Sequence, residues 1–495
     1  MIDQIKREEC CGCSACAAIC PKGCIQIEQD LEGFYHPKLN SQNCIECKKC
    51  LTICPVNQKE TSIYPETEER VTQAYAAYNT DLLQRYTSSS GGIFTLLANW
   101  VIEKGGIVFG AAFDENFQVK HIKVDSKEQI KKLQGSKYVQ SQIGDTFLKT
   151  KTYLEEGRFV LFSGTPCQIE GLLHFLKKPY ENLITIDVFC TGVPSPKIWK
   201  DYLEYRKEQA CAEKIEHINF RNKSEGWENY RVYFSFDNGI EYSKGSKEDS
   251  YMQGFIRGIF LQPACYQCKF KEIKHNSDLT LGDFWGIRKE LPEYYNFYGV
   301  SAILVHSQKG EKILKQLDQI KLKEVSVESV LRGNKNAVKS VTAFARREIF
   351  FDAYENQKLT LTEAIKKAVG QDIGQGRLRQ YFNLLKQWVE NLQNKQFLYE
   401  KLLQKEVHKV GLIGLGDIGR RLKQELELDP NNIEICFILD ENEIEFEQQL
   451  EEVKSKSCDL IIICSFVDFY ELRERLLSKD YLKEKIVSLK DLVIQ

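Results

Sequence analysis

The chain has 495 residues, 42% of them apolar and 28% charged, an ordinary globular balance with enough length for about three domains. Its formal net charge of −2 gives no support for a nucleic-acid partner. No stretch approaches the roughly 20 apolar residues that a membrane span needs, and the charged start MIDQIKREECC lacks the apolar core of a signal peptide. We therefore expect a cytoplasmic protein without a membrane span.

Cysteine is the most informative residue type. Of the 18 cysteines, ten lie between Cys10 and Cys54, five between Cys167 and Cys268, and three in the last sixty residues. Disulfide scaffolds are usually short secreted chains, whereas clustered cysteines in a long chain without a signal peptide indicate metal binding.

Residues 1–58 are predicted to form a ferredoxin-type module with two [4Fe–4S] clusters. The spacing C-x2-C-x2-C-x3-C-P occurs twice, and in such tandem runs the fourth cysteine binds the neighbouring cluster. The predicted ligands are Cys10, Cys13, Cys16 and Cys54 for one cluster, and Cys44, Cys47, Cys50 and Cys20 for the other. A pair of zinc knuckles is the alternative, but it would lack the tandem Cys-Pro pattern. Cys11 and Cys24 lie outside the spacing and are expected to be buried small residues rather than ligands.

The rest of the chain divides into further regions by its pattern. Residues 57–70 are polar and indicate a linker, and residues 70–310 alternate short β-rich runs with helix-like stretches, which is typical of a mixed α/β domain. The clearest runs are GGIVFGAAF (105–113), FVLFSGT (159–165), LITIDVF (183–189) and RVYFSF (231–236). Residues 311–405 have helical spacing and are expected to be helices, and residues 406–495 restart a β-α-β rhythm as a separate small unit.

Three segments rich in small residues are suited to holding a phosphate-bearing cofactor in the α/β domain. They are SSSGGIF, GSKYVQS and FSGTPCQIEG, and the first and third lead into helix-like stretches, where backbone N–H groups can approach a pyrophosphate. Each alone could be an ordinary turn, because Gly/Ser turns are common. The candidate cofactor contacts are Ser90, Gly91, Gly92, Gly135, Ser136, Lys137, Tyr138, Thr165 and Pro166.

Together with later motifs, these segments resemble the coenzyme F420 hydrogenase/dehydrogenase beta-subunit family. The resembling stretches are SSGGIFTLL, GSKYVQS, GTPCQIEGL, DVFCTGVPSPKIW, FRNKSEGW and CYQCKFKEIKHNSDLTLGDFWGI (265–287), so that the resemblance covers the chain from its start to about residue 350. It implies a flavoprotein that binds FAD beside iron–sulfur clusters and moves electrons between a ferredoxin-type donor and a substrate. The substrate varies within the family, from a deazaflavin coenzyme to chlorophyll derivatives.

Four further cysteines lie inside the family-like motifs, and four thiolates are what a [4Fe–4S] cluster requires. They are Cys167, Cys190, Cys265 and Cys268. We predict a third cluster beside the flavin, without Cys211, which lies in a Glu/Lys-rich helical stretch. A structural zinc on CYQC, unliganded core cysteines, and a catalytic role for Cys167 or Cys190 remain open.

The motif DLTLGDFWGI supplies candidate active-site residues. Asp283 and Trp285, with Asp278 nearby and Lys137 as a phosphate or flavin partner, are predicted to line the site, because rings stack on isoalloxazine and carboxylates orient polar groups. A buried aromatic with a capping Asp is the alternative.

A second motif, FRNKSEGW, offers an anion contact on family analogy. Its residues are Arg221, Lys223 and Trp227, and a solvated basic turn explains the two cations nearly as well. His174 is expected to be packed rather than catalytic.

The C-terminal segment contains G-x-G-x-x-G at Gly414, Gly416 and Gly419, after an apolar strand and at the start of a helix. Asp440 ends the next strand-like run, 21 residues after Gly419. This context is typical of a dinucleotide-binding fold, in which the acid accepts from a ribose hydroxyl. About 85 residues form only half of such a fold, so nucleotide binding and a structural, dimerising role both stay open. The segment resembles small Rossmann-like modules of nucleotide-sugar and glycan-modifying enzymes.

We therefore expect an α/β (α+β) protein: a ferredoxin-like two-cluster module, a mixed α/β flavin-binding domain and a small Rossmann-like unit. The leading hypothesis is an FAD-dependent oxidoreductase that takes electrons from a ferredoxin or flavodoxin and passes a hydride to a small-molecule or nucleotide-sugar substrate. The rivals are an electron-transfer subunit of a larger complex and a nucleotide-binding redox sensor. A homo-oligomer is compatible with the sequence.

Overall fold

The computed structural model describes residues 1–57, 72–369, 384–414, 417–427, 433–439, 457–464, 472–473, 476–477, 479 and 481–494. The chain divides into two compact units, Met1–Ala368 and Val369–Gln495, each of which is described by itself. None of the helices within these described ranges is long and apolar enough to cross a membrane. The linker predicted at 57–70 falls almost wholly outside them.

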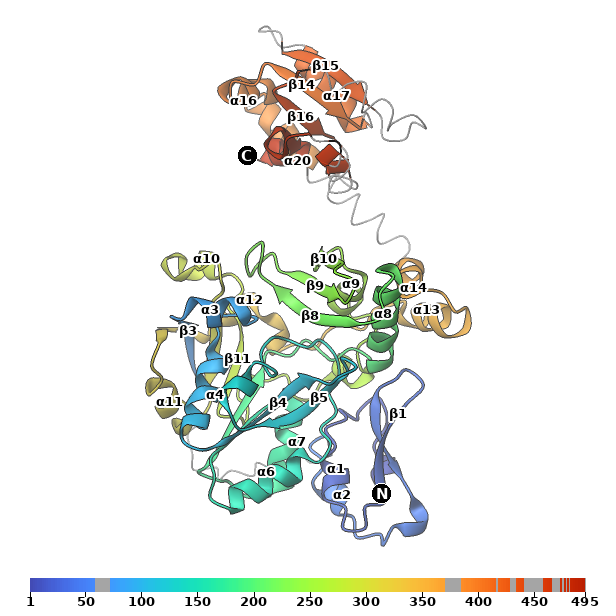
Figure 1. Cartoon of the computed structure of the whole chain (residues 1–495), viewed down its shortest axis with the longest axis vertical. Helices are drawn as coiled ribbons and strands as arrows, with labels where there is room; N and C mark the ends of the chain where they lie inside the picture. Colours follow the sequence, from blue (N-terminus) through green and yellow to red (C-terminus); the bar gives the residue numbers. More distant parts are fainter. Residues whose placement is uncertain are drawn as a thin grey trace. The chain divides into compact units, whose positions relative to one another are not determined.

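The first unit begins with a small module of loops, single helical turns and one hairpin (Figure 1). The hairpin strands are antiparallel, with Ile27 opposite Pro37. The elements of the module are η1 (Ile2–Gln4), α1 (Ala15–Ala18), β1 (Ile25–Gln29), β2 (Tyr35–Leu39), η2 (Ser41–Asn43) and α2 (Lys49–Thr52).

An eight-stranded mixed sheet forms the centre of the first unit, in the order β13-β3-β12-β11-β7-β6-β4-β5. The neighbours β4, β6, β7 and β11 run parallel, and antiparallel strands flank them on both sides. The strands are β3 (Gln73–Asn79), β4 (Ile107–Phe113), β5 (Val119–Val124), β6 (Val160–Ser163), β7 (Leu183–Val188), β11 (Leu279–Asp283), β12 (Ser301–Val305) and β13 (Ile320–Val325). The runs predicted at 105–113, 159–165 and 183–189 are thus strands of one sheet, as the expected α/β class requires.

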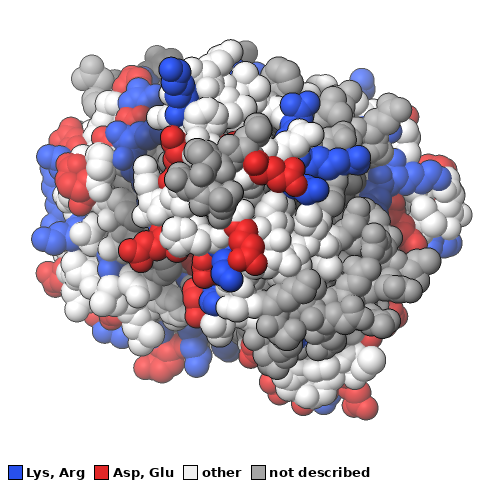
Figure 2. Space-filling model, turned by 90° about the horizontal axis from the view of Figure 1, so that it is seen from above, with Lys and Arg blue, Asp and Glu red and all other residues white. Residues whose placement is uncertain are grey.

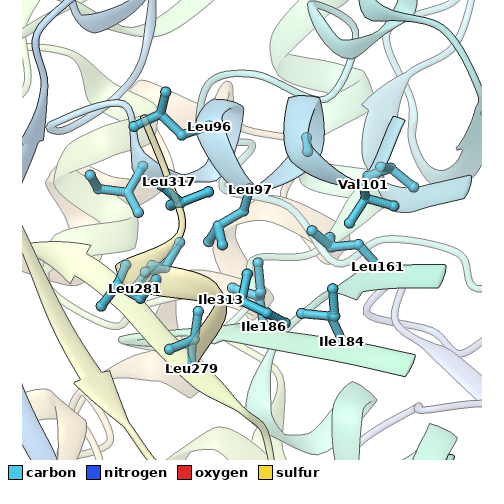
Figure 3. Packing of buried hydrophobic residues seen from close by; sticks show 14 of the residues in the cluster. Leu96, Leu97, Val101, Leu161, Ile184, Ile186, Leu279, Leu281, Ile313 and Leu317 are labelled. Atoms are coloured by element: carbon cyan, nitrogen blue, oxygen red, sulfur yellow. The ribbon is translucent and has the colours of Figure 1, made fainter. Parts of the chain in front are cut away.

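Helices cover both faces of this sheet, which explains the nearly continuous Ile, Val and Leu content of its parallel strands. On one face, Leu97 and Val101 of α4 pack against Leu161 and Ile186 of the sheet (Figure 3). On the other, Phe147 of α6 and helix α7 pack over the same strands. The covering helices are α4 (Ile93–Glu103), α5 (Lys127–Ile130), α6 (Thr146–Glu155), α7 (Pro166–Leu176) and α11 (Gln308–Lys315).

A three-stranded antiparallel meander, β8 (Ile215–Asn222), β9 (Arg231–Phe236) and β10 (Glu241–Gly245), lies beside the main sheet (Figure 1). The run predicted at 231–236 is its central strand. The remaining helical elements of the first unit are α3 (Leu82–Thr87), α8 (Pro196–Gln209), α9 (Ser250–Ile256), η3 (Pro263–Gln267), α10 (Ile287–Glu290), η4 (Pro292–Tyr294), α12 (Val327–Gly333), η5 (Lys335–Ala337), α13 (Arg347–Phe351), η6 (Asp352–Asn356) and α14 (Leu361–Val369).

The expectation that residues 311–405 are helical is wrong for one segment. Residues 320–325, IKLKEV, form strand β13, which pairs antiparallel with β3 at the edge of the large sheet. Polar and apolar residues alternate here, and the exposed lysines suit an edge strand.

The second unit contains a four-stranded parallel sheet in the order β15-β14-β16-β17. Its apolar cores include Leu412, Ile462 and Ile463 of the two central strands. The described elements are α16 (Leu398–Gln404), β14 (Lys409–Ile413), α17 (Asp417–Glu427), β15 (Glu434–Leu439), β16 (Leu460–Ile463), η7 (Lys483–Lys485), β17 (Ile486–Ser488) and α20 (Leu489–Ile494).

Candidate functional site

The two cysteine loops of the N-terminal module share one unusual backbone conformation. Gly12 and Ser14 have φ of 68° and 64°, and the equivalent residues of the second loop, Glu46 and Lys48, have φ of 53° and 57°. Residues other than glycine rarely adopt positive φ. The loop conformation therefore overrides the backbone preference of Glu46 and Lys48. Left-handed residues of this kind turn backbone N–H groups toward one concave surface, a form of anion site found at many iron–sulfur centres.

Eight of the ten cysteines of the module, the predicted ligands, gather into two groups, each combining three thiols from one run with the last thiol of the other. We name Cys10, Cys13, Cys16 and Cys54 the inner thiol group, since these thiols lie within electrostatic reach of one another. We name Cys20, Cys44, Cys47 and Cys50 the outer thiol group, since they line one small cavity. These groups are the predicted ligand sets. Cys24, expected to be a buried non-ligand, is buried, but it lines the same small cavity as a fifth thiol, with its Sγ 3.3 Å from that of Cys20.

Burial affects the ionisation of these thiols. Burial raises the pKa of Cys10 to about 12, so this thiol stays neutral at neutral pH unless a cation deprotonates it, as a coordinating metal does. Among the described residues, no three His, Cys, Asp or Glu side chains converge closely enough to hold one metal ion. In a [4Fe–4S] cluster each thiolate binds a different iron, so the ligands stand farther apart than around one zinc.

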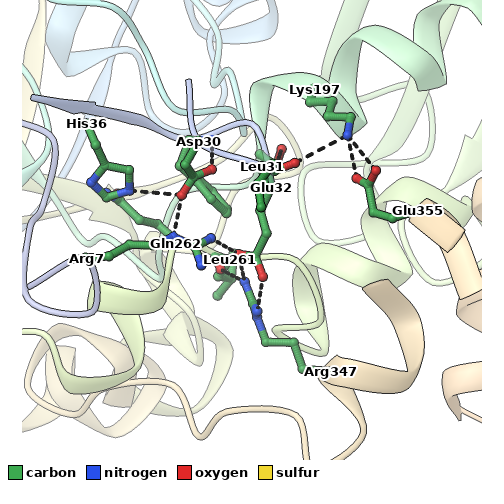
Figure 4. Close-up of polar contacts among 12 residues, drawn as sticks. Arg7, Asp30, Leu31, Glu32, His36, Lys197, Leu261, Gln262, Arg347 and Glu355 are labelled. Atoms are coloured by element: carbon green, nitrogen blue, oxygen red, sulfur yellow. Dashed lines mark hydrogen bonds and ion pairs between the residues drawn. The ribbon is translucent and has the colours of Figure 1, made fainter. Parts of the chain in front are cut away.

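The module is fastened to the rest of the first unit by charged contacts of its hairpin (Figure 4). Arg7 donates to Asp30 and Glu32, both at 2.5 Å. The Glu32 carboxylate also accepts hydrogen bonds from both terminal guanidinium nitrogens of Arg347, at 2.7 and 2.6 Å. Its backbone carbonyl accepts a hydrogen bond from the Ser195 hydroxyl. Glu32 therefore joins cations from two parts of the chain, and Arg347 lies 315 positions away from it.

A third group of thiols meets at the carboxyl ends of the parallel strands. Cys167 opens α7 after β6, Cys190 follows β7, and the CYQC pair lies on and after η3. We name Cys167, Cys190, Cys265 and Cys268 the central thiol group, because all four line one cavity of ≈ 90 Å³. Burial raises the pKa of Cys190 to about 12, which again leaves it neutral without a bound cation. Cys211 is exposed and lies apart from this cavity.

Cys11, which was expected to be a buried small residue, is a fifth thiol on this cavity. It packs with Cys13 of the inner thiol group and interacts with Cys167 of the central thiol group. Its place beside the first ligand run was visible in the sequence, but the contact with Cys167 joins two distant parts of the chain.

A larger cavity of ≈ 550 Å³ opens at the same edge of the sheet. In open α/β sheets ligands bind at the carboxyl ends of the strands, and β4, β6, β7 and β11 all contribute to its wall. The predicted site residues that line it are Ser90, Gly92, Gly135, Ser136, Lys137, Tyr138, Thr165, Asp283 and Trp285. The structure therefore brings the three small-residue segments and the DFW motif together around one space.

The two cavities share a wall. The segment Val188–Val193, with Cys190 in it, lines both the larger cavity and the cavity of the central thiol group. A redox group held by the central thiols would therefore adjoin a ligand in the larger cavity.

Two helices begin at the larger cavity, which suits an anionic ligand. Gly92 is the N-cap of α4 with φ 83°, and Ile93 and Thr95 of the first turn line the space. Thr165 caps α7 in a reciprocal capping box with Gln168, and both residues line the same space.

Lys137 is a half-buried cation on the wall of this cavity. Its ammonium donates to the backbone carbonyls of Lys132 and Gln134 at 3.1 and 2.8 Å, and burial lowers its pKa to about 7. His121, which lies in none of the sequence motifs, also lines the cavity. Its ring bonds Ser141 and the carbonyl of Ser163, and burial lowers its pKa to about 4, so it is neutral at physiological pH.

Asp283 and Arg221 form a buried two-pronged ion pair on the cavity wall. Arg221 Nη1 lies 2.7 Å from Asp283 Oδ2, and Nη2 lies 3.1 Å from Oδ1. The guanidinium also donates to the Tyr138 hydroxyl at 3.2 Å and stands 4.0 Å from the centre of the Tyr230 ring. Arg221 is thus neutralised by Asp283 rather than left free for an anion.

Trp285 and Trp227 form an aromatic stack beside this ion pair. Their ring centres lie 4.9 Å apart, and Trp227 is fully buried. Trp285 also lines the larger cavity, so the stack fixes one aromatic face at its wall.

Several predicted residues lie elsewhere. Gly91 faces the strands, because a side chain there would meet Ala77 O at 2.5 Å, and Pro166 lines the smaller cavity. Asp278 is buried and accepts from the backbone and hydroxyl of Thr185, so it fastens strands together.

Lys223 is also a fastening residue and does not line the cavity. Its buried ammonium donates to the carbonyls of Arg85, Ser90 and Tyr298, which holds the SSSGG loop in place. His174 is buried and 3.7 Å from Glu170, so it is packed as expected.

In the C-terminal unit, Gly414 follows β14 with φ 87°, and a side chain at Gly419 would meet Gly414 O at 2.3 Å. These are the turn and the close helix–strand contact of a dinucleotide-binding fold. Gly416 and Asp440, the predicted phosphate and ribose contacts, lie outside the described residues.

Comparisons with known proteins agree with the motifs. Residues 157–329 match the family described as the C-terminal part of the coenzyme F420 hydrogenase/dehydrogenase beta subunit, and residues 9–58 match the 4Fe-4S dicluster domain. These matches confirm the resemblance and identify the N-terminal module as an iron–sulfur domain. A similar solved chain belongs to the F420-reducing [NiFe] hydrogenase complex from Methanosarcina barkeri, with 18% identity and a TM-score of 0.37 over 56% of this chain and 92% of that chain. No curated protein matches the chain at a significant level.

Proposed function

We propose that this chain is an iron–sulfur flavoprotein oxidoreductase, with FAD in the larger cavity and a third [4Fe–4S] cluster on the central thiol group. When bound, the clusters would supply one-electron transfer and FAD would supply electron pairing and hydride transfer. The observation that supports this most is the shared wall Val188–Val193, which makes the thiol-lined cavity the neighbour of the larger one.

The residues of the larger cavity have distinct tasks in this proposal. The N-termini of α4 and α7, with Lys137, favour the pyrophosphate, because N–H groups and an ammonium face the same space. Trp285, held by its stack on Trp227, offers an aromatic face to a planar ring. The two hydrogen bonds from Arg221 fix the orientation of the Asp283 side chain in the cavity wall.

We propose a ferredoxin or flavodoxin as the donor and a small molecule as the substrate. The Rossmann-like geometry of Gly414 and Gly419 favours a nucleotide-linked compound, such as a nucleotide sugar, as a ligand of the C-terminal unit.

A second candidate function is a beta-type electron-transfer subunit without turnover of its own. The description of the matched family as a beta subunit favours it. An isolated chain that transfers electrons from its clusters to FAD but turns over no small molecule would support this candidate.

The flavin site is tested by filling the larger cavity. Ala111 lies on β4 and lines this space, so Ala111→Phe should place a ring where FAD would lie. We expect protein purified without oxygen to carry about one FAD per chain, and the variant to lose most of it while keeping its iron. Stoichiometric FAD in the variant would remove the cofactor from this cavity.

A further inference from the structure

The two thiol groups of the N-terminal module differ in their access to solvent. In the inner thiol group, Cys13, Cys16 and Cys54 are buried. A side chain at Gly171 of α7 would come within 2.9 Å of Cys13 Sγ, so this group packs directly against the α/β domain. In the outer thiol group, Cys47 is exposed. An electron that arrives from another protein therefore meets the outer group first.

The surface around the outer thiol group combines an apolar centre with a basic rim. Ile45, next to Cys44, is 56% exposed and lines the cavity of this group together with Pro21. Lys22, Lys48 and Lys49 are exposed around it. An apolar centre within a charged rim is the usual composition of a protein–protein interface.

The basic character of this surface is local. Against its three lysines stands the exposed Glu46, and none of the three lysines has an ion-pair partner among the residues that the structure describes. The whole chain carries a formal net charge of −2. On the face drawn in Figure 2, described basic and acidic residues are interspersed. The lysines around Cys47 are thus a positive site on a slightly negative protein.

We infer that this lysine-rimmed surface, formed by Pro21, Lys22, Ile45, Cys47, Lys48 and Lys49, docks a small acidic protein that carries single electrons. The inference rests on the proposed electron-transfer function and adds the surface at which electrons enter the protein. One electron would pass from the carrier to a [4Fe–4S] cluster bound by the outer thiol group, and no bond would be made or broken. Complementary charge steers such encounters and raises their association rate, at low salt most of all.

Charge reversal tests this surface. The probe is reduced flavodoxin, a small acidic flavoprotein, mixed with the anaerobic full-length protein, and the readout is the EPR signal of reduced clusters after rapid freezing. We expect the triple variant K22E/K48E/K49E to accept electrons about tenfold or more slowly at low ionic strength. The matched control K312E/K321E/K323E changes the same charge on α11 and β13 and should stay within about twofold of the wild type.

The wild type provides a second test that needs no variant. Docking at the positive surface predicts that the rate falls as salt is raised, whereas the net negative charge of the whole chain predicts a flat or rising rate. If the charge-reversed variant loses iron, the rate of cluster reduction in the milder variant K22Q/K48Q/K49Q and in this salt series tests the inference instead.

Three results would overturn the inference: an unchanged rate in K22E/K48E/K49E, an equal loss in the control, or a wild-type rate that does not fall with salt. Failure of the proposed function would give a different result from failure of this inference. If only the proposed function fails, flavodoxin still reduces the module with the expected charge dependence, but no electrons reach FAD or a substrate.

Discussion

At the residue scale, two cationic side chains of the larger cavity have different partners. Lys137 donates its hydrogen bonds to backbone carbonyls, whereas Arg221 is matched by the carboxylate of Asp283. The sequence predicted Lys137 and Asp283 as site residues, and both line the larger cavity, but it could not show that Arg221 would be neutralised. Gly92 has more than its expected role. It lines the cavity as predicted, but its φ of 83° and the 3.2 Å approach of a side chain there to Asn79 Cβ show that it also shapes the loop.

The lowered pKa of Lys137 makes ligand binding depend on pH. Its ammonium carries a charge below about pH 7 and loses it as the pH rises, so an anionic ligand such as FAD should bind the cavity more weakly above pH 7. The folded protein, in contrast, should gain stability from about pH 7 to about pH 10, because the cost of burying the charge disappears there. Calorimetric titration of apoprotein with FAD from about pH 6 to about pH 9 measures the first effect.

Matched variants isolate Lys137 in that titration. Lys137→Met should bind FAD weakly at every pH, and Lys137→Arg should bind it without the loss near pH 7, because a guanidinium stays charged. His121 is neutral across this range and should not contribute. A wild-type affinity that is the same at both ends of the titration would contradict a role for the Lys137 charge.

Removing one partner of the Arg221–Asp283 pair should lower the free energy of unfolding. The Arg221 side chain is only 4% exposed, so Asp283→Asn leaves a buried cation without its counter-charge. We expect the free energy of unfolding to fall by about 3 kcal/mol. The double variant R221Q/D283N should recover much of this loss, since no unpaired charge remains. Anaerobic urea unfolding measures both, and equal stability of the single and double variants would argue against the pair.

At the element scale, cysteine spacing and strand alternation were enough to predict the module and several strands, because these signals are local. Strand β13 was missed because its pattern IKLKEV stands between helix-like stretches. The contact of Glu32 with Arg347 could not be predicted from the sequence, since it joins residues 315 positions apart. The shared wall between the cavities depends on the order of the sheet, which local patterns do not give.

The docking of the hairpin β1–β2 should depend on Glu32. Glu32→Gln removes the charge that holds both Arg7 and Arg347, and we expect the hairpin to lose about 1–3 kcal/mol of protection against opening. Hydrogen exchange of the hairpin amides measures this loss.

A neighbouring ion pair serves as the control for Glu32. Lys197 touches the same turn, because its ammonium donates to the Leu31 carbonyl at 3.3 Å, but the Lys197 and Glu355 side chains are 36% and 29% exposed. Lys197→Met should therefore change hairpin protection by less than about 1 kcal/mol. Equal effects of the two substitutions would show that Glu32 has no special place in docking.

At the scale of the whole molecule, the two units have separate cores and should respond separately to substitution. A methyl group at Gly419 would meet the Gly414 carbonyl, so Gly419→Ala should destabilise the C-terminal unit by about 1–3 kcal/mol. Hydrogen exchange should show this loss in β14 and α17 and none in the large sheet. Iron and FAD content should not change, and a loss of either would contradict the independence of the units.

The central claim is that the central thiol group holds a third cluster between the module and the larger cavity. The most direct test is the iron content of the double variant C265A/C268A after anaerobic reconstitution. Three filled [4Fe–4S] sites give about 12 iron atoms per chain, and the variant should retain about eight, with the two clusters of the module intact. Its bound FAD should no longer be reduced rapidly after the module takes up electrons. An unchanged iron content in this variant would contradict the third cluster.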